Sequence, residues 1–274
     1  MNENSYQFFH LETYAIKPKK GTGRQSAESV ARECQRLEKS FPHIKSPQEP
    51  VLLYGIQPLD ALEQTRELIK DCKDYLGRRL RIDSQVISYG FLSVKVKPSK
   101  ENNDSYFVKK WEKDTIDFLK NRFGDSFKSC VKHLDEEFIH MHICITQKLD
   151  ENGGLDLNSF HPGLAAQRAC KATTKKAKDH AYKEAMRLLQ DEYYAAVSIK
   201  NGQLRYGAKR RRLTRKEWYN QKRYAKLVSN LFNEQASLIS SLGSKLDKAK
   251  NMLTQFLVRK FTDKEVALSS SKEV

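Results

Sequence analysis

The sequence predicts an α+β domain, an antiparallel sheet with flanking helices, followed by a basic helical extension. Three observations lead to this prediction. Segments rich in aromatic and β-branched residues alternate with segments of helical periodicity up to about residue 160. The following part carries few helix breakers, and its last third repeats apolar residues at alternating spacings of three and four. A chain of 274 residues accommodates one large domain with an extension.

The first part is predicted to have the order β-α-β-α-β-α-β-β. Strands are expected at residues 6–16, 50–56, 84–96, 126–133 and 139–147, and helices at residues 26–40, 58–76 and 102–123. Ser26 is suited to cap the first helix, and Gly124 is suited to end the third. The basic segment with Lys19, Lys20 and Arg24 is expected to be a loop.

The second part is predicted to be helical. Pro162 is placed to begin a helix that runs to about Val197, and Thr214 with Glu217 forms a capping box before another helix. Apolar residues from Phe232 to Phe256 then form a heptad seam, which suggests a homodimer or intramolecular packing. We expect a core at residues 1–160, a helical extension at residues 161–262 and a disordered tail at residues 263–274.

Composition narrows the class of protein. Lys and Arg number 50 against 34 Asp and Glu, a net charge of +16, which favours a polyanionic partner such as nucleic acid. The five cysteines are scattered without CxxC spacing, so a reducing cytoplasm is the expected compartment. No apolar run reaches the ~18 residues of a membrane helix, and the beginning of the chain lacks a secretory signal.

The segment HLDEEFIHMHI, residues 133–143, predicts a metal site. Side chains alternate along a strand, so His140 and His142 share one face while Ile139, Met141 and Ile143 occupy the other. A hairpin brings His133 across from that pair, and Glu136 in the turn is a candidate fourth ligand or orienting residue.

Two other interpretations of this segment stay open. The histidines could be polar residues on the solvent-exposed face of a strand, without a metal. Structural zinc is the next alternative, for which Cys144 is the one thiol on the same face. Three histidines suit Mn²⁺, Zn²⁺ or Ni²⁺ better than Mg²⁺ on ligand preference.

The same segment resembles the third motif of the MobV class of plasmid relaxases, the Mob/Pre recombination proteins, whose pattern is HxDExxPHxH. Ile139 stands where that pattern has proline. The resemblance extends over about residues 5–200 and is strongest at residues 111–145. It implies an HUH-type fold and metal-dependent nicking of one DNA strand at an origin of transfer, with Mn²⁺ or Mg²⁺ held by His133, His140 and His142 and supported by Glu136.

The nucleophile is not evident from the sequence. The MobV class has an N-terminal His-Asn-x-Arg-like motif, and the comparable segments here, residues 29–32 and 33–36, keep Arg32 or Arg36 but lack the histidine. Tyr14, at the end of the first strand, is the tyrosine candidate, and a metal-activated water is an alternative. His10 and His43 are further candidates, whereas Cys34 and Ser29 fit the chemistry of this class poorly.

Basic and aromatic residues predict a nucleic-acid surface around the start of the last long helix, because arginines bind phosphates and aromatic rings stack on bases. The candidates there are Lys209, Arg210, Arg211, Arg212, Arg215, Trp218, Tyr219 and Lys222. Lys19, Lys20 and Arg24 form another group, and a further one contains Arg168, Lys171, Lys175, Lys176 and Lys178. A solvated charged face is the alternative for each.

Together these features predict a DNA-binding relaxase-like protein of a mobile genetic element that acts in conjugation or plasmid mobilization. Its partner would be an origin hairpin or single-stranded DNA. A non-catalytic DNA-binding accessory factor of transposition or integration is the first alternative, and a metal-dependent RNA-processing enzyme is the second.

Overall fold

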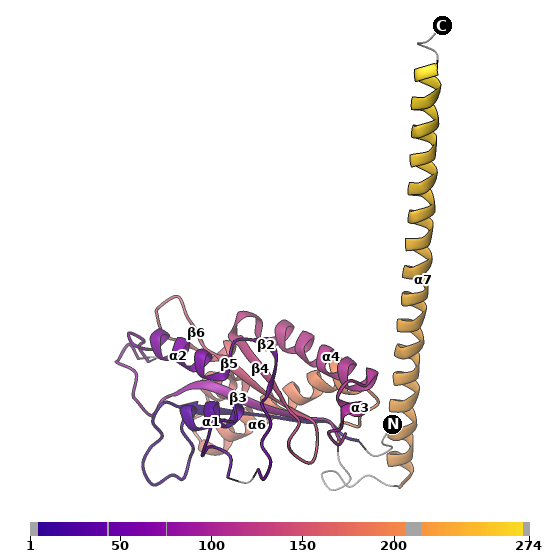
Figure 1. Cartoon of the computed structure of the whole chain (residues 1–274). Coiled ribbons are helices and arrows are strands. Elements are labelled where there is room, and N and C mark those ends of the chain that lie inside the picture. The colour runs from indigo at the N-terminus through magenta and orange to yellow at the C-terminus, as the bar shows by residue number, and fades with distance from the viewer. Residues whose placement is uncertain (1–4, 43, 75, 207–214, 271–274) are drawn as a thin grey trace. The chain divides into compact units, whose positions relative to one another are not determined.

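The computed structural model describes residues 5–42, 44–74, 76–206 and 215–270 (Figure 1). The chain divides into two compact units, Met1–Ala225 and Lys226–Val274. The main strands are β1 (Phe8–Ala15), β2 (Val51–Gly55), β3 (Gln85–Ser93), β4 (Phe127–His133) and β5 (His140–Thr146). The main helices are α1 (Ala27–Cys34), α2 (Pro58–Leu68), α4 (Tyr106–Phe123), α5 (Pro162–Ala169), α6 (Lys175–Tyr193) and α7 (Arg215–Ser270). Shorter elements are α3 (Lys100–Asn103), β6 (Lys148–Leu149), β7 (Leu155–Asp156) and the turns η1 (Gly124–Ser126), η2 (Leu157–Ser159) and η3 (Tyr194–Ser198).

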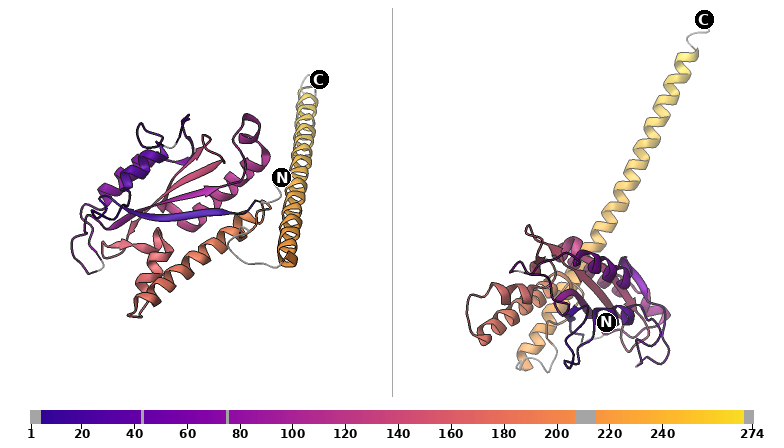
Figure 2. Two further views of the ribbon diagram at one scale, coloured as in Figure 1. Left: turned by 90° about the horizontal axis from the view of Figure 1, so that it is seen from below. Right: turned by 90° about the vertical axis from the view of Figure 1, so that its left-hand side faces the viewer.

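The first unit is built on a five-stranded sheet with the order β1-β3-β5-β4-β2, in which every neighbouring pair is antiparallel. This confirms the predicted α+β class and antiparallel sheet. The chain brings β5 to the centre, between β3 and β4. Figure 2 shows helices on both sides of the sheet.

One face of the sheet forms the larger core with α4 and α6. Met141 and Ile143 of β5 pack there with Trp111 of α4 and Tyr193 of α6, and all four side chains are buried. The Trp111 indole N–H donates a hydrogen bond of 3.2 Å to the Tyr193 hydroxyl oxygen. Because this hydrogen bond is made inside the core, both rings are buried without the free-energy cost of an unsatisfied polar group.

The opposite face is covered in part by α1 and α2. Ala31 of α1 and Leu62 of α2 pack against Val131 and Cys144 of the sheet. The amphipathic pattern of α1 and its N-cap explain this contact, because Ser26 Oγ accepts a hydrogen bond from Ser29 N and Val30 lies on the buried side. Beyond the end of α1, the same face of the sheet carries the three motif histidines.

Several predicted helices are shorter or broken. The segment expected to be one helix at residues 102–123 is α3 and α4, because Ser105 caps a new helix by accepting a hydrogen bond from Val108 N. Thr174 likewise caps α6, so the helix expected from Pro162 is interrupted after Ala169. The helices expected to end at residues 40 and 76 end at Cys34 and Leu68.

The predicted organisation also differs at its boundaries. Leu189 and Tyr193 of α6 belong to the core of the first unit, so that unit extends past the expected boundary at residue 160 to Ala225. Helix α7 continues to Ser270 where a disordered tail was expected from residue 263. Within the described residues, no helix is long and apolar enough to cross a membrane.

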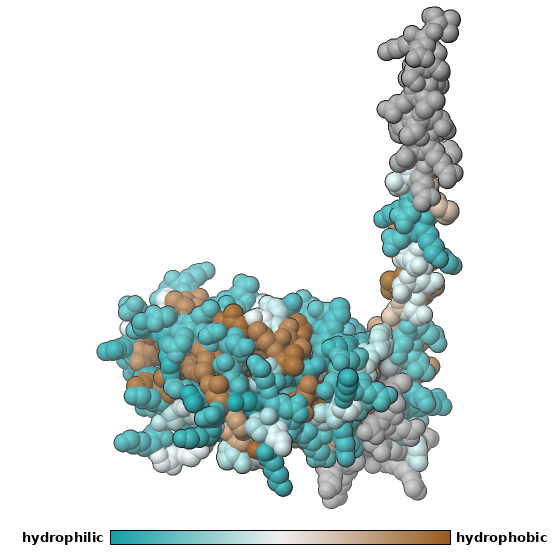
Figure 3. All heavy atoms as spheres, in the orientation of Figure 1, coloured by the Kyte–Doolittle hydropathy of each residue, from teal (hydrophilic) through white to brown (hydrophobic). Residues whose placement is uncertain are grey.

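The second unit contains the greater part of α7. Large apolar side chains on it are exposed, among them Ile239, Leu242, Leu246 and Leu253. Figure 3 shows hydrophobic and hydrophilic side chains mixed along its described part.

Candidate metal centre

Two neighbouring strands bring the three motif histidines together. Strand β4 ends with His133, and β5 carries His140 and His142 two residues apart. The register pairs His133 directly with His140 across the two strands. One potential ligand atom from each ring lies within 4.8 Å of the others, and the ring centroids are 4.5–5.2 Å apart. The predicted convergence of His133, His140 and His142 is therefore present in the structure.

Backbone carbonyl groups orient two of the rings. His133 Nε2 lies 2.8 Å from the Cys34 carbonyl oxygen, and His140 Nδ1 lies 2.9 Å from that of Phe138. A carbonyl only accepts, so each of these nitrogens is the protonated one. The other nitrogens, His133 Nδ1 and His140 Nε2, then present lone pairs, and both are buried without a hydrogen-bond partner.

This donor set fits a divalent metal. Metal-binding histidines typically donate their second ring N–H to a carbonyl or carboxylate, which fixes the tautomer and the ring orientation. Lone pairs on two buried nitrogens with no proton donor nearby are the groups that a cation would satisfy. The three imidazoles would supply three ligands, and Glu136 lies close enough to supply or support a fourth.

Burial favours the neutral, ligand-competent form of the histidines. It lowers the pKa of His133 to about 4, helped by the positive charge of Arg36. It also lowers the pKa of His142 well below its usual value, and the neighbouring His133 and His140 act in the same direction. Both rings are therefore neutral at pH 7, as a metal ligand must be.

Glu136 borders the centre as a carboxylate. Its Oε1 atom lies 3.4 Å from His140 Nε2 and accepts a hydrogen bond of 2.7 Å from Arg36 Nη2. Hydrogen bonding and charge from His140 in its protonated form, followed by those of Arg36, lower the pKa of Glu136 to about 2. The Arg36 guanidinium acts on this carboxylate in either state of His140. The predicted position of Glu136 beside the histidines is thus observed; whether it binds a metal or orients a ligand stays a prediction.

Arg36 has a different place from the one expected of a catalytic residue. Its Nε atom donates a 2.8 Å hydrogen bond to Asp135 Oδ2, and its Nη2 atom donates one of 2.8 Å to Asp135 Oδ1. Both side chains are almost fully buried. Arg36 also has a φ of 52°, a left-handed conformation that ends α1 at the preceding turn. Arg36 thereby fixes the turn of residues 134–139 that carries Glu136.

A cavity of about 310 Å³ opens beside His140. Its lining contains Tyr6, Phe8 and Phe91, with the exposed Lys95 at its edge. Tyr6 and Phe8 are exposed by 46% and 38%, so their rings are available to a ligand. The ring of Phe91 lies 4.6 Å from that of His140 and 5.5 Å from that of Phe8, measured between centroids. These aromatic residues therefore connect the cavity to the histidines.

Sequence reasoning missed this aromatic group. The register of β1 with β3 pairs Phe8 with Ser93 and His10 with Phe91, and β3 in turn pairs Phe91 with His142. Alternation along each strand could have placed Phe8 and Phe91 on one face, but periodicity within a strand does not reveal that β1 pairs with β3.

Tyr14 lies on the same face of the sheet as the histidines but is distant from them in the strand direction. It pairs with Ile87, four residues along β3 from Phe91, which corresponds to roughly 13 Å in the strand direction. Its hydroxyl donates a 3.1 Å hydrogen bond to Glu12, and burial together with Glu12 raises its pKa. The structure therefore does not bring Tyr14 to the histidines, as a nucleophile would require. Cys34 is buried, and its contact with the site is through its carbonyl group.

The predicted basic groups lie in several places. Exposed Lys19 and Arg24 line a cleft with Tyr14, and Lys20 is exposed in the same loop. Tyr219 is exposed and Lys222 half-buried on α7. His43, Lys209, Arg210, Arg211 and Arg212 lie outside the described residues, as do the side chains of Arg215 and Trp218.

Comparisons with known proteins give distant structural likenesses. No family model and no curated protein matches the chain. A manganese-bound crystal structure of the MobM relaxase domain (MOBV class) with plasmid pMV158 oriT DNA is 14% identical with a TM-score of 0.41, covering 79% of this chain and 98% of that one. Another MobM–oriT DNA complex is 11% identical with a TM-score of 0.39, covering 78% and 99%. A structure described as the molecular basis of vancomycin resistance transfer in Staphylococcus aureus has 14% identity, a TM-score of 0.29 and coverages of 70% and 94%.

Proposed function

We propose that this protein is a relaxase-like DNA-binding protein that cuts one DNA strand with the help of a divalent metal. The observation that carries the proposal is the convergence of His133, His140 and His142, whose potential ligand atoms lie within 4.8 Å of one another, together with a buried nitrogen without a hydrogen-bond partner on His133 and on His140. The +16 net charge supports a polynucleotide as the partner. Plasmid mobilization or conjugation is the proposed setting, because the sequence pattern HxDE followed by HxH resembles the MobV motif.

The chain's own groups have distinct tasks in this proposal. His133, His140 and His142 would hold the metal, and the Cys34 and Phe138 carbonyls keep two of the rings in the ligand-competent orientation. A bound divalent ion would offset negative charge on the scissile phosphate. Glu136 stays negatively charged and would support the ion or orient His140. Manganese fits three imidazoles and a carboxylate better than magnesium does, and zinc or nickel fits equally well on ligand type.

The cavity beside His140 supports a single strand as substrate. Unpaired bases stack on aromatic faces, and Tyr6, Phe8 and Phe91 supply three rings within one cavity. Lys95 lines the same cavity together with Glu136 and Glu137, and it is the side chain there that would contact a phosphate. A duplex keeps its bases stacked inside, so it would not use these rings. The single-stranded region beside an origin hairpin is the form of DNA that suits this surface.

The cavity also suggests where a nucleophile would be found. Tyr6 is the tyrosine among the described residues that line it. His10 of β1 pairs with Phe91, which in turn pairs with His142. We therefore place Tyr6 and His10 before Tyr14 as candidates for a covalent link to DNA, with a metal-activated water as the alternative.

Two further parts of the proposal concern the state of the protein. We infer a homodimer through the exposed heptad residues of α7. We also place the protein in a reducing cytoplasm, supported by its five cysteines, all of which are free thiols.

A second candidate function is a non-catalytic DNA-binding accessory factor. The position of Tyr14 favours it, because this tyrosine is distant from the histidine centre. Arg36 lies beside the centre, but its guanidinium is held by Asp135 and Glu136. A metal-dependent RNA-processing enzyme is the third candidate function.

Three assays separate these functions. Supercoiled DNA from the cognate element is incubated with Mn²⁺ and the protein, and conversion to the open circle is measured for wild type and His140→Ala. We expect nicking by the wild type alone. A denaturing gel then reports a protein–DNA adduct in wild type, Tyr6→Phe, His10→Ala and Tyr14→Phe. Absence of nicking by the wild type, together with equal DNA binding by wild type and His140→Ala, would reject the enzyme. Preferential competition by RNA would favour the third candidate function.

A further inference from the structure

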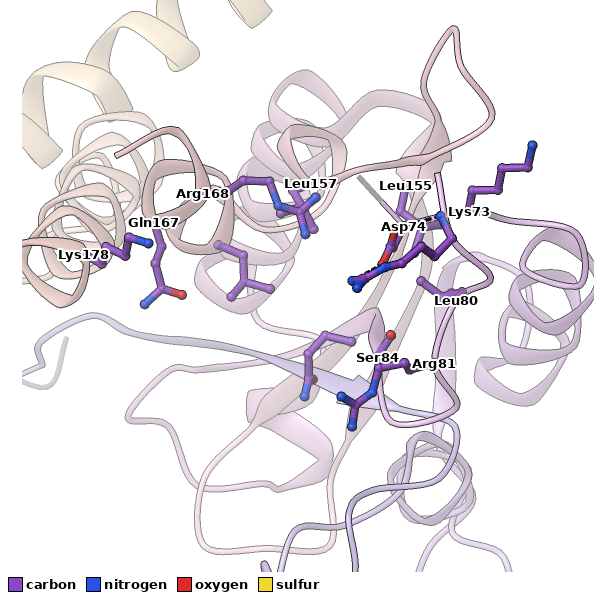
Figure 4. A pocket seen from close by; sticks show the side chains of 13 residues that line it. Lys73, Asp74, Leu80, Arg81, Ser84, Leu155, Leu157, Gln167, Arg168 and Lys178 are labelled. Atoms are coloured by element: carbon purple, nitrogen blue, oxygen red, sulfur yellow. Dashed lines mark hydrogen bonds and ion pairs between the residues drawn. The ribbon is translucent and has the colours of Figure 1, made fainter. Parts of the chain in front are cut away.

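A second large cavity lies away from the histidine centre. It has a volume of about 590 Å³ and is formed by the segment between α2 and β3 together with β7, η2, α5 and α6. Figure 4 shows Arg81 and Arg168 extending into it from opposite sides. Neither the histidine motif nor the aromatic cavity beside His140 contributes to it.

The lining of this cavity, the arginine-rimmed cavity, is strongly positive. Among the described residues, five cationic side chains and one carboxylate line it. They are Lys73, Arg78, Arg81, Arg168, Lys178 and Asp74. Asp74 accepts hydrogen bonds of 2.9 and 2.7 Å from Arg78, and Asp83 accepts bonds of 2.9 and 2.8 Å from Arg81. These pairs hold two guanidinium groups in place. With Asp83 included, five cationic residues face two carboxylates among the described residues, so the balance stays positive. The N–H groups of Arg78 and Arg81 that the carboxylates leave uncovered would contact phosphate oxygens.

The floor of the cavity is apolar. Leu80, Leu155, Leu157 and Leu164 form it, and each is half-buried. Ser84, Gln85 and Gln167 add neutral hydrogen-bonding groups around the leucines. A concave site with an apolar floor, amide and hydroxyl groups and a cationic rim matches the three parts of a nucleotide, which are a base face, base edges and a phosphate.

A second cleft adjoins this cavity. Gln85 lines both, and the second cleft contains Tyr14 and Tyr182 together with two cationic residues, Lys19 and Arg24, and two carboxylates, Glu12 and Asp83. Lys178 of the first and Tyr182 of the second stand four residues apart on α6 and hence on one side of it. The surface thus continues from an arginine rim to two tyrosine rings, a combination of charge and stacking groups that binds unpaired strands.

We propose that the arginine-rimmed cavity and the adjoining cleft bind an unpaired segment of the polynucleotide at a distance from the histidine centre. Gln85 lies six residues along β3 from Phe91, which corresponds to roughly 20 Å. The inference rests on the proposed function, since the strand held here would be the one presented to His140. Its bases contact the leucine floor and the tyrosine rings, and its phosphates contact Arg81 and Arg168. A duplex fits this site poorly, because its bases do not reach the leucines.

The test is a binding measurement without metal, so that it does not depend on strand cutting. Fluorescence anisotropy is measured in EDTA, over a range of NaCl concentrations, for a labelled single strand and for the duplex of the same sequence. We expect the double variant Arg81→Ala with Arg168→Ala to lose at least ~10-fold in affinity for the single strand. The slope of log affinity against log salt should become shallower by about 0.7 for each phosphate that the variant no longer neutralises. Affinity for the duplex should change less than ~3-fold.

A matched pair of substitutions controls for net charge. The double variant Lys113→Ala with Arg122→Ala also removes two positive charges, both from α4. Its affinity for the single strand should stay within ~2-fold of the wild-type affinity. Should the first double variant unfold, the single Arg81→Ala, an exposed side chain, is expected to give about half the effect on the free-energy scale. Unchanged single-strand affinity, or an equal loss for single strand and duplex, overturns the inference. Absence of nicking by the wild type, with the anisotropy results expected here, would overturn the proposed function alone.

Discussion

His140 Nε2 lies 3.4 Å from Glu136 Oε1, although the other nitrogen of the same ring lies 2.9 Å from the Phe138 carbonyl oxygen. If the Phe138 carbonyl accepts the ring proton, a lone pair faces a carboxylate. Two electron-rich atoms at this distance repel each other, and the Arg36 guanidinium, which donates a 2.7 Å hydrogen bond to the same Oε1 atom, offsets part of that repulsion. A cation held by His140 and its neighbouring histidines would offset it further.

His140→Ala should abolish or greatly weaken metal binding. Loss of a group that only supports a ligand typically costs 10–100-fold in metal affinity, so removal of a ligand should cost at least ~100-fold, and Glu136→Gln should fall within about 10–100-fold. Isothermal titration with Mn²⁺ measures both. His180→Ala, which changes an exposed histidine on α6, is the control and should bind as wild type does. Equal affinities in His140→Ala and His180→Ala would contradict the assignment of the centre.

The metal-free protein should lose stability as the pH falls from 7 toward 4. The pKa of His133 is about 4 in the folded protein and about 6.5 when unfolded, so between these values the unfolded chain binds a proton that the folded protein does not. This lowers the free energy of unfolding by about 2 kcal/mol between pH 8 and pH 5, and His142 adds to the loss because its pKa is lowered too.

Urea unfolding at several pH values in the presence of a chelator measures this loss. His133→Asn removes the titrating ring and should flatten the dependence between pH 7 and pH 5, whatever its effect on overall stability. His180→Ala should keep the wild-type dependence, because His180 is exposed. A wild-type unfolding free energy that is constant over this range would show that His133 is not buried in its neutral form.

Arg36→Ala should lower the free energy of unfolding more than a substitution in an exposed ion pair does. The substitution leaves the Asp135 carboxylate buried without its partner, and breaking such a pair typically costs about 3–5 kcal/mol. The double variant Arg36→Ala with Asp135→Ala should recover part of this loss. Chemical denaturation measures all three variants. Lys70→Ala, which breaks an exposed pair with Glu67, should change the free energy of unfolding by less than ~1 kcal/mol. A cost below ~1 kcal/mol for Arg36→Ala would mean that Arg36 does not hold the turn.

Local patterns in the sequence were sufficient to predict the histidine centre. His133, His140 and His142 lie on two strands joined by a short turn, so strand alternation and one hairpin bring them together. The helix ends were less predictable. Ser105 and Thr174 are polar residues inside otherwise helical segments, and their side chains cap new helices instead of facing solvent.

Local sequence patterns could not predict contacts between residues that are far apart in the chain. Arg36 meets Asp135 across 99 positions, and nothing near either residue indicates the pair. Arg168 was predicted to lie in a basic group with its sequence neighbours, yet it lines a cavity with Arg78 and Arg81 because α5 packs beside the segment before β3. Such sets depend on the order of strands and helices, which the sequence periodicity leaves open.

The apolar seam of α7 should pair with that of a second copy of the chain. Phe232, Ile239, Leu246 and Leu253 are spaced by seven residues, and Gln235, Leu242 and Ala249 alternate with them, which is the spacing of a coiled coil. Ile239 is exposed by 70%, and Leu242, Leu246 and Leu253 are exposed by 54–59%, an arrangement that leaves apolar surface in water. Pairing would bury these residues, and Gln235 within the seam would help to fix the register.

Leu242→Asp with Leu246→Asp should therefore convert a dimer into a monomer, because two carboxylates in each helix would be buried at the interface. Analytical ultracentrifugation of the full chain over a range of concentrations measures the change. Ser240→Asp with Ser244→Asp adds the same charge to α7 outside the seam positions and should leave the dimer intact. A wild type that stays monomeric at tens of micromolar, or equal dissociation in both double variants, would argue against the seam as a contact between copies. Metal binding at the histidines should be the same in all of these variants, since the residues of the centre belong to the other compact unit.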